Sequence, residues 1–188
     1  MALLIAGIVL FIGIHLVPVL TGLRSNLFHT LGEKRYKAVF SLASALGLIL
    51  IIIGFGRAPA EPRLFAPFPA AIMAAPLVML VSFVLFASAN MKTHIRSRLR
   101  HPMLLGLLLW SGVHLLANGE LRTTILFGAF LAYAVIDLIS ATSRHAVKQF
   151  TPVARQDLMA ITGGVLLALL VMTFHRQLFG VASVPWGT

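Results

Sequence analysis

Three ionisable side chains lie inside long apolar runs of the sequence, namely His15, His114 and Asp137. Placing an imidazole or a carboxylate in hydrocarbon is costly, so each such residue is a candidate for function by default. Neutral imidazole is also a ligand that haem iron, copper and zinc accept. Because the sequence contains no cysteine, any metal must be held by histidine, carboxylate, methionine or backbone oxygen.

His114 belongs to a set of residues that recur at every fourth position. Residues four apart lie above one another on a helix, so the set forms a slowly drifting stripe on one face. Its members are Gly106, Trp110, His114 and Asn118. A stripe of small, aromatic, imidazole and amide groups is unusual for a lipid-facing surface. The stripe therefore predicts either that His114 is a ligand or that this is a core helix in which Gly106 lies at a close helix crossing.

His15 lies on nearly the same helix face as Gly7 and Phe11. The glycine would let another backbone or a flat ligand approach this face. An imidazole that is hydrogen-bonded to a carbonyl across a helix packing seam explains His15 equally well. The sequence therefore leaves both a ligand role and a packing role open for this residue.

A basic segment at residues 98–102 precedes the fourth apolar run and contains Arg100 and His101. Pro102 is suited to the first turn of a helix, where its missing N–H breaks no hydrogen bond. His101 therefore opens this helix, where it could bind a metal or transfer a proton. Solvation beside the arginines is the alternative interpretation.

Asp137 lies about one turn from the end of its apolar run. Pairing with Arg100, Arg144 or a histidine such as His101 would keep it ionised. A structural ion pair and support of a ligand histidine by a hydrogen bond both remain open for this residue. His175 is expected at the level of the lipid headgroups. The histidines expected to be solvated in basic loops are His29, His94 and His145.

The sequence has no HExxH, GxSxG, glycine-rich phosphate loop or paired carboxylates, so hydrolase and kinase functions are not indicated.

The composition identifies the class of protein that must position these residues. Of 188 residues, 59% are hydrophobic and 11% are charged, whereas a soluble domain has roughly 25% charged residues. About 20 apolar residues cross a bilayer, and six apolar runs are present. The sequence thus predicts an all-α integral membrane protein, a single domain over residues 1–188 with six transmembrane helices at about 3–20, 38–55, 69–89, 103–118, 123–141 and 158–178. Pro76 should kink the third.

Lysine and arginine are distributed unequally between the two sets of connections. Eleven lie in the odd-numbered connections: Arg24, Lys34, Arg35, Lys37, Lys92, Arg96, Arg98, Arg100, Arg144, Lys148 and Arg155. Four lie on the other side: Arg57, Arg63, Arg122 and Arg176. Because basic loops stay in the cytoplasm, this places both termini on the non-cytoplasmic side. We expect the basic loops to contact anionic lipids, and we do not expect a nucleic-acid partner.

Several short motifs along the chain resemble those of the NnrU family of small bacterial membrane proteins, whose plant and cyanobacterial relatives include the 15-cis-zeta-carotene isomerase. The similarity covers nearly the whole chain. The residues that carry it are His15, Gly22, Leu23, Arg24, Leu31, Gly32, Glu33, Tyr36, Phe40, Arg100, His101, Pro102, Gly106, Trp110, His114, Asn118 and Gly119.

This resemblance implies a b-type haem bound between histidines. By position, His15 and His114 match the axial pair, and His101 is the substitute. Trp110 and Arg100 complete the implied cofactor-binding residues, with Arg100 able to meet the haem propionates. The resemblance further implies a multi-pass protein of the bacterial cytoplasmic membrane that acts in nitric oxide and nitrite metabolism or in haem-dependent cis–trans isomerisation of a polyene. Nitric oxide or a hydrophobic small molecule would then be its partner.

Two other functions remain open at this stage. One is a membrane assembly or transport accessory protein without a catalytic site, in which the histidines serve packing or proton transfer. The other is a membrane methyltransferase, because an Arg-His-Pro sequence at the mouth of a helix also resembles those enzymes. The segment from Thr142 to Pro152 contains no acidic residue, and this absence weakens the methyltransferase hypothesis.

Overall fold

The protein is described by a computed structural model that covers residues 1–147, 149–181 and 183. Helices are the regular elements of this described part, which has one isolated β-bridge, between Arg63 and Glu120. The helices are α1 (Ala2–Leu16), α2 (Thr21–Arg57), α3 (Pro69–Ser88), α4 (His94–Leu99), α5 (Pro102–Ala117), α6 (Leu121–Ser143), α7 (Ala154–Thr173) and α8 (His175–Phe179).

Within the described residues, α2, α3, α6 and α7 are the four helices that are both long and apolar enough to cross a membrane. The helices α1 and α5 are also apolar but shorter, with 15 and 16 residues. The prediction of an all-α membrane protein is therefore confirmed. Pro76 lies inside α3, which continues as one helix through it.

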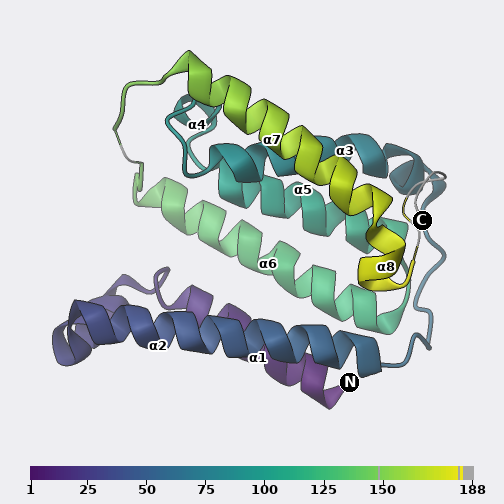
Figure 1. The fold of residues 1–188 in the computed structure, drawn as a ribbon. Coiled ribbons are helices and arrows are strands. Elements are labelled where there is room, and N and C mark those ends of the chain that lie inside the picture. The colour runs from purple at the N-terminus through teal and green to yellow at the C-terminus, as the bar shows by residue number, and fades with distance from the viewer. Residues whose placement is uncertain (148, 182, 184–188) are drawn as a thin grey trace.

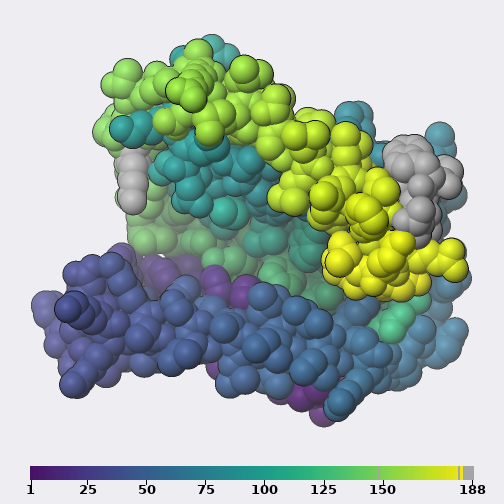
Figure 2. Space-filling view, in the orientation of Figure 1, coloured from purple at the N-terminus to yellow at the C-terminus, as the bar shows by residue number. Residues whose placement is uncertain are grey.

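Each of the two shorter apolar helices packs between two longer ones. Helix α1 packs against α2 and α6, and α5 packs against α6 and α3. Helix α7 then packs on α3, so the long helices flank the short ones (Figure 1). In the space-filling view, a recess separates α2 from α7 and has α6 at its base (Figure 2). The bundle is thus an α1–α2 hairpin joined through α6 to the remaining helices.

Several helix boundaries differ from the sequence predictions. The run at 3–20 ends as a helix at Leu16, since a turn that contains Pro18 follows it. The run at 38–55 is only the second part of α2, which begins at Thr21 and is kinked at Gly32, where φ is 74°. The run at 158–178 is divided between α7 and α8, and the six-residue helix α4 was not predicted. Polar turns of helix carry no apolar run, so the pattern of hydrophobicity misses them.

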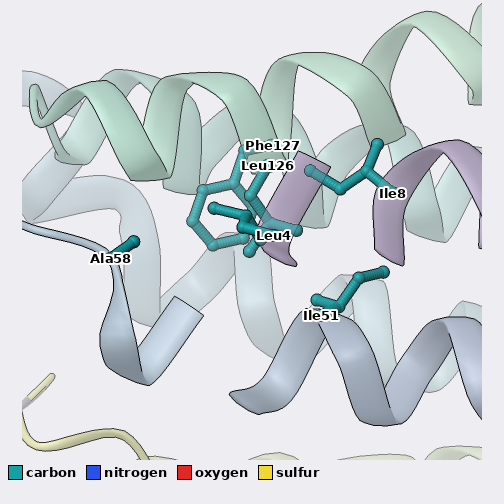
Figure 3. Close-up of a cluster of buried hydrophobic side chains, with 6 residues drawn as sticks. All are labelled: Leu4, Ile8, Ile51, Ala58, Leu126 and Phe127. Atoms are coloured by element: carbon teal, nitrogen blue, oxygen red, sulfur yellow. The ribbon is translucent and has the colours of Figure 1, made fainter. Parts of the chain in front are cut away.

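Glycines bring the backbones of α1 and α2 into contact. A Cβ atom at Gly7 would lie 2.6 Å from the Ile51 nitrogen, and one at Gly54 would lie 2.4 Å from the Leu4 nitrogen. Small residues at such crossings allow close van der Waals packing of membrane helices. Around this seam, a buried cluster joins the hairpin to α6 (Figure 3). Its members are Leu4, Ile8, Ile51, Ala58, Leu126 and Phe127.

A second buried cluster lies between α3, α5 and α7. It consists of Met79, Val113, Ala168 and Met172. The half-buried Trp110 packs against this cluster and also against the cluster around Leu4. Trp110 is therefore a packing link between the two halves of the bundle.

The polar connections gather at the two ends of the bundle. Helix α4 and the α6–α7 connection lie at one end, and Met1 and α8 lie at the other (Figure 1). The basic residues of the odd-numbered connections thus share an end, with Lys148 outside the described residues. Successive apolar helices run antiparallel, so alternate connections lie at opposite ends of the bundle (Figure 1). This arrangement separates the basic residues of the odd-numbered connections from the smaller group on the other side.

Candidate functional site

His15 is the first of the predicted site residues, and it lies near the end of α1. Its Nδ1 is 2.7 Å from the carbonyl oxygen of Phe11. A carbonyl only accepts a hydrogen bond, so Nδ1 carries the proton and Nε2 keeps a lone pair. The ring stacks on Phe11 at 4.2 Å and meets the edges of Phe40 at 5.1 Å and Tyr133 at 6.0 Å. His15 is therefore enclosed by aromatic groups from α1, α2 and α6.

His114 makes the same local hydrogen bond on α5. Its Nδ1 donates to the carbonyl of Trp110 at 2.8 Å, and the Asn118 amide donates to the His114 carbonyl at 2.7 Å. The His114 ring lies 4.6 Å from the ring of Phe127 on α6. The stripe predicted from Gly106 to Asn118 is thus a stack of residues on one helix face, and here too Nε2 keeps the lone pair.

One side of His114 borders a cavity of about 270 Å³ between α3, α5 and α7. The lining is mostly apolar, and its polar members include Asn118 and His175. The Nδ1 of His175 donates to the carbonyl of Val181 at 2.6 Å. His175 thus contributes to a cavity wall, a role that the sequence prediction of a residue at headgroup level does not include.

An aromatic cluster lies between His15 and His114. The ring of Phe130 is 5.7 Å from Phe11 and 5.6 Å from Trp110. Within the described residues, the two imidazoles contact this cluster from opposite sides and share no direct ring contact. Their partners on α6, Tyr133 and Phe127, are six residues apart, which corresponds to about 9 Å along the helix.

His101 is the N-cap residue of α5, as predicted. Its Nε2 is buried and has no hydrogen-bond partner among the described residues. In the same described part, the hydroxyl of Tyr36 is buried without a partner, and the Tyr36 ring lies 6.4 Å from Phe40 beside His15. Buried polar atoms without partners are rare, and a bound group is one explanation for them. Arg100, in contrast, is exposed and lines a separate surface cavity.

Asp137 forms two polar contacts on α6. The hydroxyl of Tyr133 donates to one carboxylate oxygen at 3.1 Å, and the Arg144 guanidinium lies 3.9 Å from the other. The predicted pairing with Arg144 is therefore confirmed. Sequence reasoning missed Tyr133, although its position four residues before Asp137 was a usable signal. Tyr133 also meets the ring of His15 edge-on, so ring packing joins His15 to the Tyr133–Asp137 pair.

His94 is exposed, as expected, and its imidazole is also paired with Asp157. The Nδ1 atom lies 2.6 Å from one carboxylate oxygen, and the His94 backbone N–H donates to the other at 2.8 Å. These groups are far apart in the sequence, so no local pattern indicates the pair. Among the described residues, no group of three or more His, Cys, Asp or Glu side chains is placed to hold a metal ion.

Comparison with known proteins identifies the family. Residues 3–183 match the NnrU protein family, which is nearly the whole chain. A search of curated proteins and a search of solved structures each give no match. The sequence resemblance to NnrU proteins is thereby confirmed, and the chain belongs to the NnrU protein family.

Proposed function

We propose that this NnrU-family membrane protein binds haem b through histidine Nε2 atoms within the bundle. The observation that carries the proposal is the shared arrangement of His15 and His114, each of which donates from Nδ1 to the carbonyl four residues earlier. Such a second hydrogen bond fixes the tautomer and the ring orientation of a ligand histidine. The Nε2 of His101 is buried and has no partner in the part of the chain that the structure describes, so it is a third candidate ligand atom.

The residues around these histidines would set the properties of the site. Phe40, Tyr133 and Phe127 surround the imidazoles with apolar surface, which limits access of water. When bound, haem would supply one-electron chemistry and a binding position for nitric oxide or for a polyene double bond. Phe130 and Trp110 lie between His15 and His114, so joint ligation by this pair requires these two rings to move. Ligation that includes His101 is the alternative arrangement.

The biological setting of the proposal comes from the family. The NnrU resemblance links the chain to nitric oxide and nitrite metabolism, and its isomerase relatives suggest cis–trans isomerisation of a polyene as the alternative reaction. The apolar cavity beside His114 supports a small hydrophobic ligand in either case. The proposed location is the bacterial cytoplasmic membrane.

We further propose that all six apolar helices span the membrane, with both termini on the non-cytoplasmic side. Helix α1 would extend about 22 Å at 1.5 Å per residue, and its packing between the longer helices α2 and α6 supports a crossing. The basic end of the bundle would face the cytoplasm and its anionic lipids. A reporter fused to the C terminus should be active outside the cytoplasm, and cytoplasmic activity would refute this topology.

The haem proposal is tested by absorption spectra of the detergent-purified protein, oxidised and then reduced, with iron quantified per chain. We expect a Soret band, sharp reduced α and β bands, and nearly one iron per chain. His15→Ala and His114→Ala should each lower the haem content severely. His29→Ala is the matched control, because His29 is exposed on α2. Full haem retention by both site variants would refute this pair, and the spectrum of His101→Ala would then test the substitute.

A second result would favour the accessory function. If the purified protein is colourless, contains no iron and does not take up added haemin, the histidines serve packing or proton transfer. The protein would then be a membrane accessory factor of the NnrU family. The same samples distinguish these functions without knowledge of a substrate.

A further inference from the structure

A surface cavity of about 360 Å³ lies at the end of the bundle that holds α4 and the α6–α7 connection (Figure 1). Its lining comprises Ser97, Arg100, His145, Val147, Gln149 and Phe150. The five acidic residues of the chain all lie in its described part, and none of them lines this cavity. The cavity therefore presents cationic and neutral polar groups without a counter-charge.

Arg100 has an unusual backbone conformation at one side of this cavity. Its φ is 63° and its ψ is −49°, and the His101 N–H donates to the Leu99 carbonyl at 2.7 Å. This pattern is a γ-turn with positive φ, which is rare and strained for a residue with a side chain. A glycine would adopt it at lower cost.

His145 has a left-handed backbone at the other side. Helix α6 ends in a motif in which the His145 N–H donates to the Thr142 carbonyl and the Ala146 N–H donates to the Ala141 carbonyl, at 3.1 and 3.0 Å. The residue at the His145 position of this motif is usually glycine. Here it is a histidine with φ of 48°.

Arg100 and His145 are the two non-glycine residues with positive φ in the part of the chain that the structure describes. Both line the same cavity, although they lie 45 positions apart in the sequence. Residues in such conformations are energetically unfavourable and cluster at binding and switch sites. The coincidence indicates that these side chains are held in place for a ligand.

Contacts of α4 and the α3–α4 connection with the start of α7 and the segment before it lie beside the cavity. The Val153 N–H donates to the Lys92 carbonyl at 2.8 Å, and Asp157 accepts the backbone N–H of His94 at 2.8 Å. The Arg96 guanidinium also lies 5.0 Å from the centre of the Phe150 ring. The α4 region and the α6–α7 connection are thus joined before any ligand binds, which lowers the cost of binding.

We propose that this cavity binds a phosphate group at the membrane surface. Arg100 offers a planar guanidinium that suits phosphate oxygens, and Ser97 and Gln149 offer neutral donors. His145 adds a donor, and a positive charge when protonated. The phosphate of a lipid headgroup and a soluble phosphate ester share this chemistry. Arg100 is also the residue expected to meet the haem propionates, whereas His145 has no part in the haem proposal. His145→Gly is therefore the variant that tests phosphate binding separately from haem binding.

The experiment uses the full chain with two phosphate probes. Glycerol 3-phosphate is titrated into the detergent-purified protein by calorimetry, and phosphatidylglycerol retention is measured by native mass spectrometry against phosphatidylcholine. We expect wild-type protein to bind at least one of these probes. Retention of phosphatidylglycerol alone identifies a lipid headgroup as the source, and binding of glycerol 3-phosphate alone identifies a soluble ester.

The variants distinguish a built site from a general positive charge. His145→Gly should weaken phosphate binding several-fold while the thermal unfolding temperature stays the same or rises, because glycine relieves the backbone strain. Arg100→Gln should weaken binding about tenfold, a loss typical of a charged hydrogen bond. Arg98→Gln is the matched control, since Arg98 is an exposed arginine of α4 that does not line the cavity.

Three results would overturn the phosphate proposal. One is the absence of binding of either probe by wild-type protein. Another is equal weakening by Arg98→Gln and Arg100→Gln, which would show a diffuse charge effect. The last is unchanged binding by His145→Gly and Arg100→Gln. The absorption spectrum of the same His145→Gly sample separately tests the haem proposal, because His145 is not among the haem ligand candidates.

Discussion

The surroundings of His15 and His114 differ although their local hydrogen bonds are the same. Each Nδ1 donates to the carbonyl four residues earlier in the helix. The His15 ring is enclosed by Phe40 and Tyr133, whereas the His114 ring has Phe127 on one side and a cavity of about 270 Å³ on another. The hydrogen bond within each helix thus sets the imidazole tautomer of both histidines. The packing between helices, in contrast, leaves a cavity beside His114.

This difference assigns distinct contributions to the two histidines. The His15 region joins a closely packed helix hairpin to the polar pair of Tyr133 and Asp137, so it is suited to a fixed ligand with a nearby titratable group. The His114 region borders an apolar space, so it is suited to the entry of a small hydrophobic molecule. Variants that disturb one region alone should therefore separate binding of haem from access of a ligand.

Trp110→Ala should have the largest effect, because this side chain packs against the buried clusters of both regions. Truncation of a large aromatic residue leaves a cavity and typically costs about 3 kcal/mol. We expect this loss in the free energy of unfolding, measured by circular dichroism in mixed detergent micelles. Phe174→Ala is the control, since Phe174 is an exposed aromatic residue of the same bundle. Equal losses in both variants would contradict the linking role of Trp110.

Gly54→Ala should disturb the His15 region next most strongly. The added Cβ would lie 2.4 Å from the backbone nitrogen of Leu4, so α1 must move away from α2. Overpacking of this type typically costs about 1–3 kcal/mol. Gly56→Ala is the control, because a Cβ at Gly56 would meet no atom within 4 Å. We expect unfolding measurements to separate the two variants, and similar stability of both would refute the close hairpin.

The sequence predicted the apolar part of the fold well and its polar part poorly. Pro102 is the first residue of α5, as expected from its missing N–H. The first part of α2 was missed because it is polar and is separated from the second part by the kink at Gly32. Directly after that kink, Glu33 and Lys37 form an ion pair four residues apart at 2.5 Å, a signal that was available in the sequence.

The candidate site was predicted where helix periodicity decides the arrangement. The stacking of Trp110 and His114 follows from their spacing, and their hydrogen bond confirms it. The contact of His15 with Tyr133 depends on how α1 meets α6, which spacing within one helix does not indicate. The cavity at His145 depends on a left-handed backbone at the end of α6. Glycine normally occupies such a position, so a histidine there does not indicate this conformation in the sequence.

Gly164→Ala should disturb the His114 region while the His15 region stays intact. Its Cβ would lie 2.6 Å from Cα of Val84, so α7 must move away from α3 and the cavity beside His114 must change shape. We expect a loss of about 1–2 kcal/mol of unfolding free energy and altered binding of nitric oxide in haem-loaded protein. The adjacent Gly163→Ala is a close control, because its Cβ has open space. Identical ligand binding in the two variants would argue against the cavity as the access route.

Tyr133→Phe and Tyr36→Phe form the smallest and most discriminating comparison, since both remove one hydroxyl from the surroundings of His15. The Tyr133 hydroxyl donates to Asp137 at 3.1 Å, whereas the Tyr36 hydroxyl is buried and finds no partner among residues 1–147, 149–181 and 183. Loss of a hydrogen bond to a carboxylate should cost about 1 kcal/mol, and loss of an unpaired buried hydroxyl should cost nothing or stabilise the protein. Unfolding of haem-free protein should show this order.

If haem-loaded protein shows a cost for Tyr36→Phe that haem-free protein lacks, the Tyr36 hydroxyl acquires its partner when the cofactor binds. That result would place the cofactor beside His15, and its absence would direct attention to His114.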